Sequence, residues 1–125
     1  MLQVPAPTPM TDDFCYLTTT GRSTGRSHEI EIWYAADGAT LYLLSGGGDR
    51  ADWVRNLRAD PTVTVRLGET THPAAARVIT DRDEDRRARM LVFEKYQPRY
   101  AGDLEHWRET ALPVALDLTS AAPAS

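Results

Sequence analysis

The chain has 125 residues, of which 42% are hydrophobic and 26% are charged, and its formal net charge is −4. This length and mixture fit one folded domain with one core, and they exclude a chain kept unfolded by its own charge. The negative charge argues against a nucleic-acid-binding protein, because contact with phosphate needs a basic face.

The two ends of the chain differ in composition from its middle. Residues 1–12 are rich in proline and residues 119–125 in small residues, so we expect a flexible N-terminal arm, a domain at 13–118 and a flexible tail. The start lacks the pattern of a secretory signal, and no stretch is long enough for an integral membrane segment. The lone cysteine, Cys15, can form no internal disulfide, so we expect a cytoplasmic protein.

The first half of the domain is predicted to consist of strands separated by turns. Phe14–Thr20 is rich in aromatic and β-branched residues, which predicts a strand, and Gly21–Ser27 is a polar turn. Glu29–Tyr34 alternates strictly, with Ile30, Ile32 and Tyr34 on one face and Glu29, Glu31 and Trp33 on the other, which predicts a second strand. Asp37-Gly38 is a hairpin signal, so we expect Leu41–Ser45 to return as the partner of that strand.

The second half is predicted to mix helices and strands. Asp49–Ala59 has apolar residues at helical spacing, and Thr62–Leu67 and Thr70–Ile79 predict two further strands. Thr80 can cap a longer helix whose acidic start and basic continuation suit the helix dipole. A short helical turn then leads to a last strand, Leu112–Leu118. Strands outnumber helices, which favours a mainly β (α+β) fold, a small closed sheet with helices packed outside.

Short segments along the chain form an ordered set that covers nearly all of residues 14–118. They include LTTTGRSTG at residues 17–25, Trp53–Leu57, Asp60-Pro61, Lys95-Tyr96, and Leu112-Pro113-Val114. In this order they resemble the deazaflavin-dependent nitroreductase and quinone reductase family. The resemblance implies a split β-barrel of the FMN-binding type that binds coenzyme F-420, an 8-hydroxy-5-deazaflavin, or in some relatives FMN or FAD.

The resemblance also implies a reaction and an assembly. Members of the family transfer hydride between the cofactor and a small-molecule electron acceptor such as a quinone, a nitro compound or an enone, and the cofactor ring carries the chemistry. A homodimer is implied as well, and we expect apolar area for it on an exposed sheet with Trp33, Tyr34 and Tyr42.

The turn after the first strand is the first candidate cofactor site. A glycine-bearing turn lets backbone N–H groups converge on an anion, and an arginine can form two hydrogen bonds to phosphate. The residues are Arg22, Ser23, Thr24, Gly25 and His28. Relatives that use the deazaflavin usually have lysine at Ser23 and arginine at His28, so FMN or FAD stays open as the cofactor. The alternative is a plain hairpin loop with solvated arginines.

The triple-glycine turn is the second candidate region. Three successive glycines can turn their amides toward a ligand, and a helix beginning nearby would add its positive dipole end. The residues are Ser45, Gly46, Gly47, Gly48 and Arg50. The alternative is that Asp49 simply caps the helix.

Trp53 and Asn56 stand three residues apart, so they share one face of the expected helix. The tryptophan would wall the ring pocket, and the amide would hydrogen-bond to the cofactor or to a strand. The alternative is that Trp53 is a core residue and Asn56 a satisfied buried amide, and both interpretations can hold together.

Three aromatic residues late in the chain are candidates for the acceptor side, namely Tyr96, Tyr100 and Trp107. Tyrosine offers an apolar ring and a hydroxyl that can bond a quinone oxygen. The alternative is packing beneath the helix end.

Glu29 and Glu31 point to one face of a strand, an alternation more typical of a solvated face than of a metal site. We therefore expect no metal. The leading hypothesis is a deazaflavin- or flavin-dependent oxidoreductase, and the alternatives are a non-catalytic cofactor-binding protein and an interaction module with an empty barrel.

Overall fold

The computed structural model describes residues 13–119; the expected arm, 1–12, and residues 120–125 of the expected tail lie outside the described residues. The strands are β1 (Cys15–Thr20), β2 (Ser27–Ile32), β3 (Ala35–Asp37), β4 (Thr40–Ser45), β5 (Thr62–Leu67), β6 (Thr70–Val78) and β7 (Leu112–Leu118). The α-helices are α2 (Asp52–Ala59), α3 (Arg82–Tyr96) and α4 (Glu105–Thr110), and the short 3-10 turns are η1 (Gly48–Arg50) and η2 (Gln97–Arg99).

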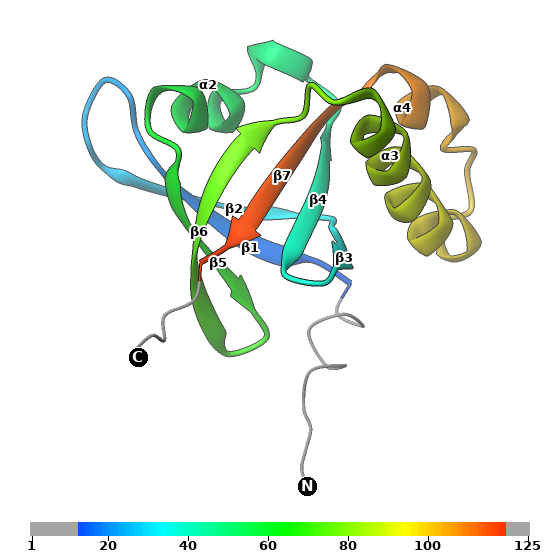
Figure 1. The fold of residues 1–125 in the computed structure, drawn as a ribbon, viewed down its shortest axis with the longest axis horizontal. Coiled ribbons are helices and arrows are strands. Elements are labelled where there is room, and N and C mark those ends of the chain that lie inside the picture. The colour runs from blue at the N-terminus through cyan, green and yellow to red at the C-terminus, as the bar shows by residue number, and fades with distance from the viewer. Residues whose placement is uncertain (1–12, 120–125) are drawn as a thin grey trace, which may run out of the picture.

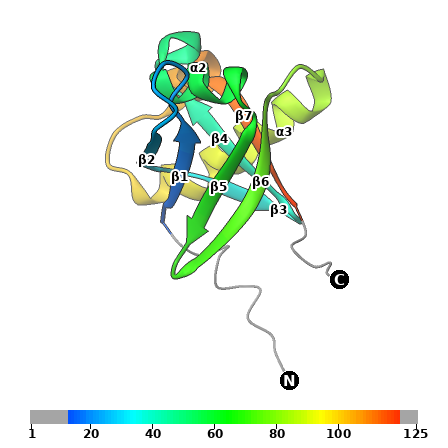
Figure 2. The same cartoon turned by 90° about the vertical axis from the view of Figure 1, so that its left-hand side faces the viewer.

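All strands belong to one antiparallel sheet with the order β2-β1-β5-β6-β7-β4-β3 (Figure 1). The two edge strands, β2 and β3, are consecutive in the chain, and only Trp33 and Tyr34 separate them. Two linking residues reach about 10 Å, so the sheet must curl until its edges approach each other. The result is a half-closed barrel with the helices outside it, as expected from the sequence (Figure 2).

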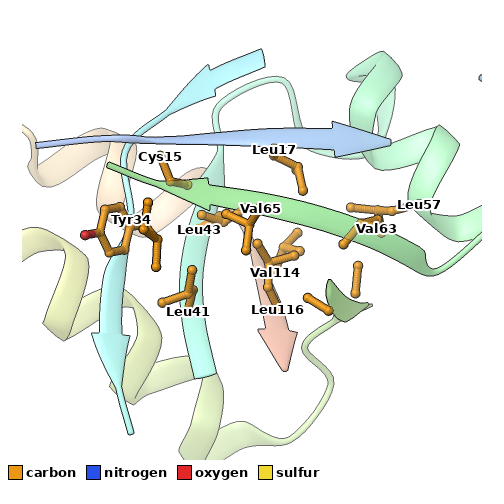
Figure 3. Close-up of a cluster of buried hydrophobic side chains, with 13 residues drawn as sticks. Cys15, Leu17, Tyr34, Leu41, Leu43, Leu57, Val63, Val65, Val114 and Leu116 are labelled. Atoms are coloured by element: carbon orange, nitrogen blue, oxygen red, sulfur yellow. The ribbon is translucent and has the colours of Figure 1, made fainter. Parts of the chain in front are cut away.

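β4 is buried on both sides because it lies between two cores. Leu41 and Leu43 belong to the core inside the barrel, whereas Tyr42 and Leu44 belong to the core between the sheet and α3. Side chains that alternate along a strand point to opposite faces, which explains this division. Figure 3 shows the inner core, where Leu43 lies near Val65 of β5.

The long helix α3 covers the outer face of β3, β4 and β7 with a stripe of three buried residues, Ala88, Val92 and Tyr96. The expected cap, Thr80, is wrong by one residue. Asp81 caps the helix instead, because its carboxylate accepts a hydrogen bond of 2.9 Å from the amide of Glu84.

The expected hairpin between Glu29–Tyr34 and Leu41–Ser45 is wrong. β2 pairs with β1, and the short strand β3 pairs with β4 across a turn at Gly38, whose φ is 62°. The Asp-Gly turn is therefore where the sequence predicts it, but it joins a different pair. The chain leaves β2 at Trp33, whose ring stacks on Tyr96 with 4.3 Å between centroids.

The helix expected from Asp49 begins later, at Asp52. Ala51 is extended, with φ −63° and ψ 136°, and it separates η1 from α2. Asp49 does not cap α2; its carboxylate pairs with Arg58 at 2.6 Å.

The apolar surface expected for dimerisation is also wrong in its residues. Tyr34 and Tyr42 are 0% and 3% exposed, and Trp33 is half-buried beneath the segment that follows α3. The two tyrosine rings fill the chain's own cores and are not available to a partner, whereas the half-buried Trp33 ring also lines a pocket.

Candidate functional site

A cleft of about 520 Å³ opens between the β1–β2 turn and α2, and we call it the turn cleft. Several of the predicted cofactor residues line it together: Arg22, Ser23, Thr24, His28, Trp53 and Asn56. The turn and the helix are far apart in sequence, so their convergence is a product of the barrel fold.

Asn56 ties the helix to the turn. Its Oδ1 accepts hydrogen bonds from the Arg22 amide at 3.2 Å and from Arg22 Nη1 at 2.7 Å, and its Nδ2 donates to Thr19 Oγ1 at 3.3 Å. The side chain is buried, so these bonds satisfy an amide that would otherwise be costly to bury. Asn56 is therefore a satisfied buried amide that also lines the cleft.

Asp52 lines the turn cleft as well, and the sequence interpretation missed it. Its Oδ1 lies 3.2 Å from Nη2 of Arg22, so the guanidinium meets a carboxylate at the mouth of the cleft. The aspartate is largely exposed, which makes the pair weak. Its spacing of four residues from Asn56 was a signal that both lie on one face of α2.

The turn itself presents free backbone donors. Its closing bonds run from the Gly21 amide to the Arg26 carbonyl at 2.7 Å and from the Gly25 amide to the Gly21 carbonyl at 2.8 Å. Within residues 13–119, no group accepts from the amides of Ser23 and Thr24, although both residues line the cleft. Successive unpaired amides in a turn form a concave site for an anion.

Gly21 is a second residue that the sequence interpretation missed. A Cβ there would lie 2.7 Å from Nε2 of His28 and 3.0 Å from Oγ1 of Thr24. The missing side chain therefore lets the imidazole lie against the backbone of the turn. Gly21 lies directly after β1, where a close approach of this kind has no sequence signature of its own.

Trp53 has a half-buried ring that belongs to two environments. It packs against the core inside the barrel and also lines the turn cleft. Both interpretations of this residue, as core and as cleft wall, are compatible with the structure.

The other predicted cofactor residues do not line the turn cleft: Gly25, Ser45, Gly46, Gly47, Gly48 and Arg50. Ser45 is buried at the end of β4 and donates to the Gly48 carbonyl at 3.1 Å. Gly46 lies against the indole of Trp107, because a Cβ at this glycine would be 3.6 Å from that ring.

A second pocket, of about 450 Å³, lies between the end of β2 and the segment from η2 to α4. Three aromatic rings line it, those of Trp33, Tyr100 and Trp107, and we call them the aromatic box. The rings of Tyr100 and Trp107 stand at 78° and 88° to the ring of Trp33, with centroids 5.8 and 5.7 Å away. Trp33 was not predicted as a pocket residue, because the sequence pattern assigned it to an exposed strand face.

Tyr96, the third predicted acceptor-side residue, does not line this pocket. It is buried beneath Trp33; its hydroxyl oxygen accepts a hydrogen bond from the Tyr34 amide at 3.0 Å, and the carbonyls of Asp13 and Tyr34 both lie within reach of its proton. Burial raises the pKa of Tyr96 to about 12, so the phenol stays protonated at neutral pH. Tyr96 therefore supports the aromatic box by stacking its ring on that of Trp33.

Within the described part of the chain, no three His, Cys, Asp or Glu residues come together as ligands for a metal ion. No helix of residues 13–119 is long and apolar enough to cross a membrane.

The family model of the F420H(2)-dependent quinone reductases matches residues 4–119. The chain belongs to this family. The F420H(2)-dependent quinone reductase of Mycobacterium tuberculosis is 34% identical over an alignment of 88 residues that covers 67% of this chain and 59% of that protein. The alignment thus spans less than two thirds of the curated relative. A putative F420H(2)-dependent quinone reductase of Mycobacterium bovis matches to the same extent.

Solved structures share the fold of this F420H(2)-dependent quinone reductase family member. An F420-H2 dependent reductase has a TM-score of 0.68 at 19% identity, over 83% of this chain and 93% of that chain. An FAD-binding protein of Mesorhizobium loti has a TM-score of 0.70 at 14% identity, over 92% of this chain and 85% of that chain. At these identities the likeness concerns the split β-barrel alone.

Proposed function

We propose that the protein is an oxidoreductase that binds reduced coenzyme F-420 in the turn cleft and uses it to reduce a small activated acceptor, such as a quinone, a nitro compound or an enone. The observation that carries the proposal is the pair of unpaired amides of Ser23 and Thr24 beside Arg22. Membership of the F420H(2)-dependent quinone reductase family favours the deazaflavin as the cofactor.

The residues of the turn cleft fit an anionic cofactor with a flat ring. The two amides would hold a phosphate or carboxylate oxygen, and the second edge of the Arg22 guanidinium would add a charge-assisted hydrogen bond. Trp53 offers a partly exposed indole as a wall for the ring.

The chemistry comes from the bound cofactor, which supplies one hydride, so that a quinone with one further proton from water becomes a hydroquinone. The chain's own residues bind and orient the cofactor and the acceptor, and they exclude water from the site. Asn56 holds the turn against α2, so the donors of the turn are fixed before the cofactor arrives.

The aromatic box is the proposed acceptor side. Its rings favour a flat acceptor by stacking, and Tyr100 has an exposed ring whose Oη would donate a hydrogen bond to an acceptor oxygen. Trp107 lies against Gly46, so the box borders the loop that follows β4.

A homodimer in the cytoplasm is part of the proposal. One similar structure, 20% identical with a TM-score of 0.68, is a domain-swapped dimer. Within the described residues β2 pairs only with β1, so its outer edge carries unpaired donors and acceptors beside the turn cleft. The buried free thiol of Cys15 suits a reducing compartment.

FMN or FAD is the second candidate cofactor. The charge of Arg22 is already paired with Asp52, and Glu29 also lines the cleft. These carboxylates disfavour a long acidic tail more than the short phosphate of a flavin.

An anaerobic turnover assay tests the proposal. Reduced deazaflavin and a soluble naphthoquinone are mixed with the protein, and oxidised cofactor and hydroquinone are both measured. We expect protein-dependent formation of one hydroquinone per cofactor oxidised. Binding of the cofactor without turnover would instead favour a non-catalytic carrier, and turnover with reduced FMN alone would favour the flavin.

A further inference from the structure

The aromatic box is walled on three sides by π-systems. Trp33 forms its floor, and the rings of Tyr100 and Trp107 stand nearly perpendicular to it at 5.8 and 5.7 Å. The floor is rigid, because the opposite face of Trp33 stacks on Tyr96 at 4.3 Å and 4°. Three converging rings of this kind are the geometry by which proteins recognise organic cations.

The same pocket is lined by a carboxylate, that of Asp103. Within residues 13–119, neither an arginine nor a lysine pairs with this carboxylate. No arginine or lysine among the described residues lies over the three box rings, although Tyr16 has the Arg66 guanidinium at 4.1 Å from its centroid. In the part of the chain that the structure describes, a carboxylate and three aromatic rings thus share a pocket in which neither an arginine nor a lysine lies against them, and His106 also lines this pocket.

The carboxylate and the exposed ring are held in place by the backbone around them. Gln97 donates from Nε2 to the Gly102 carbonyl and accepts at Oε1 from the Leu104 amide, both at 2.8 Å, so it clamps the two neighbours of Asp103. A Cβ at Gly102 would lie 2.8 Å from the ring of Tyr100, so only glycine allows this packing. The pocket is thus preformed, which lowers the entropic cost of binding.

We propose that the aromatic box is a binding site for a small organic cation with an apolar head, and that the acceptor is a cation of the N-alkylated heteroaromatic class, whose ring carbon can take the hydride. This inference deepens the proposed function. It rests on that function only where it identifies the bound cation with the electron acceptor. A neutral flat acceptor gains stacking and a hydrogen bond from Tyr100, whereas a cationic acceptor gains stacking together with attraction to the rings and to the charge of Asp103. The site therefore ranks cationic acceptors above neutral ones of the same shape.

A pair of probes with the same shape tests the binding site without any cofactor. Phenyltrimethylammonium and tert-butylbenzene differ in charge but hardly in size. Each is titrated into the full chain while the indole N–H resonances of the tryptophans are followed by NMR. Trp33 and Trp107 report on the box, and Trp53 reports on the turn cleft.

We expect the cation to shift the Trp33 and Trp107 resonances, to leave Trp53 unmoved, and to bind about tenfold more tightly than the neutral probe. Asp103→Asn keeps the side-chain oxygen that accepts from the Glu105 amide and removes only the charge, so it should lose most of this preference. Asp83→Asn on the exposed side of α3 makes the same change in net charge, and this variant should keep the preference for the cation.

Equal affinity for the two probes would overturn the proposal, and so would an equal effect of the two asparagine variants. Because neither titration contains a cofactor, the result is independent of whether the deazaflavin binds. If the cation binds as expected but no acceptor is reduced, the box stands and the proposed function fails.

Discussion

Asn56 and Arg22 are joined by two hydrogen bonds to a single atom, Oδ1 of the amide, at 3.2 Å from the arginine's backbone nitrogen and 2.7 Å from its Nη1. One side chain of α2 thereby fixes both the main chain and the side chain of a turn that lies 34 residues earlier. The shape of the turn cleft depends on this contact.

Asn56→Ala should therefore lower both stability and cofactor affinity. The variant leaves the buried Thr19 hydroxyl and the Arg22 amide without their partner, and we expect a loss of about 1–3 kcal/mol in the free energy of unfolding. Denaturant unfolding and cofactor titration measure the two effects. Arg55→Ala, on the exposed side of the same helix, is the control and should change neither by much. Full affinity in the Asn56 variant would show that the turn needs no support from α2.

Asp52→Asn should increase the affinity for an anionic cofactor. The change removes the carboxylate that competes for the guanidinium of Arg22, and we expect about threefold tighter binding at low salt, shrinking as salt is added. The matched control is Glu69→Gln in the β5–β6 turn, at the end of the barrel away from α2 (Figure 1). If both variants tighten binding equally, the gain comes from net charge and Arg22 is not in the site.

Gly21→Ala should weaken cofactor binding and leave the fold intact. The new methyl group would displace the exposed imidazole of His28, which can swing into solvent, so the free energy of unfolding should fall little. Affinity should fall severalfold, and adding His28→Ala to this variant should cause almost no further loss. Additive losses in the double variant would mean that the two residues act separately.

The stability of the fold should fall in acid because of a cluster around Arg77. This arginine bonds Glu84 of α3 at 2.6 Å and Asp117 of β7 at 2.7 Å, and these hydrogen bonds hold the pKa of both carboxyls below their usual values. The two carboxylates contribute fully to the stability of the fold at a pH above their pKa values in the unfolded chain, which are about 4. This contribution is lost as the pH falls through their lowered pKa values in the folded protein.

Arg77→Met should remove that contribution. Because the Arg77 and Asp117 side chains are partly exposed and water screens their charges, we expect it to lower the free energy of unfolding at pH 7 by only about 1 kcal/mol and to flatten its dependence on pH below 5. Unfolding curves at several pH values measure this, with Arg87→Met as the control, because Arg87 makes a single exposed pair with Asp37. An unchanged pH slope in the Arg77 variant would contradict the assignment.

Much of the fold could be predicted because its strands carry strong local patterns. Thr62–Leu67 was predicted with the bounds it has, and Leu112–Leu118 likewise, since both are bounded by turns or prolines. The pairing of β2 could not be predicted, because it depends on the bend at Trp33. That bend is held by contacts with Tyr96, a residue from the other half of the chain.

The candidate site was predictable to a similar degree. The turn from Arg22 to His28 was found by its glycines and arginine, and the structure brings it to α2. The triple-glycine loop does not line the turn cleft, since Ala51 is extended and separates that loop from α2, and its role in binding the cofactor stays a prediction. Asp52 and Gly21 were missed since their roles arise from tertiary contacts with Arg22 and His28.

The central claim is that the turn after β1 holds the anionic part of the cofactor with its own backbone. It is tested most directly by adding oxidised F-420 to isotope-labelled protein and following the backbone amide resonances. The account predicts that the Ser23 and Thr24 amides shift with the largest amplitude and saturate together with the Trp53 indole. Saturable binding that leaves these two amides unmoved, with shifts confined to other parts of the barrel, would contradict it.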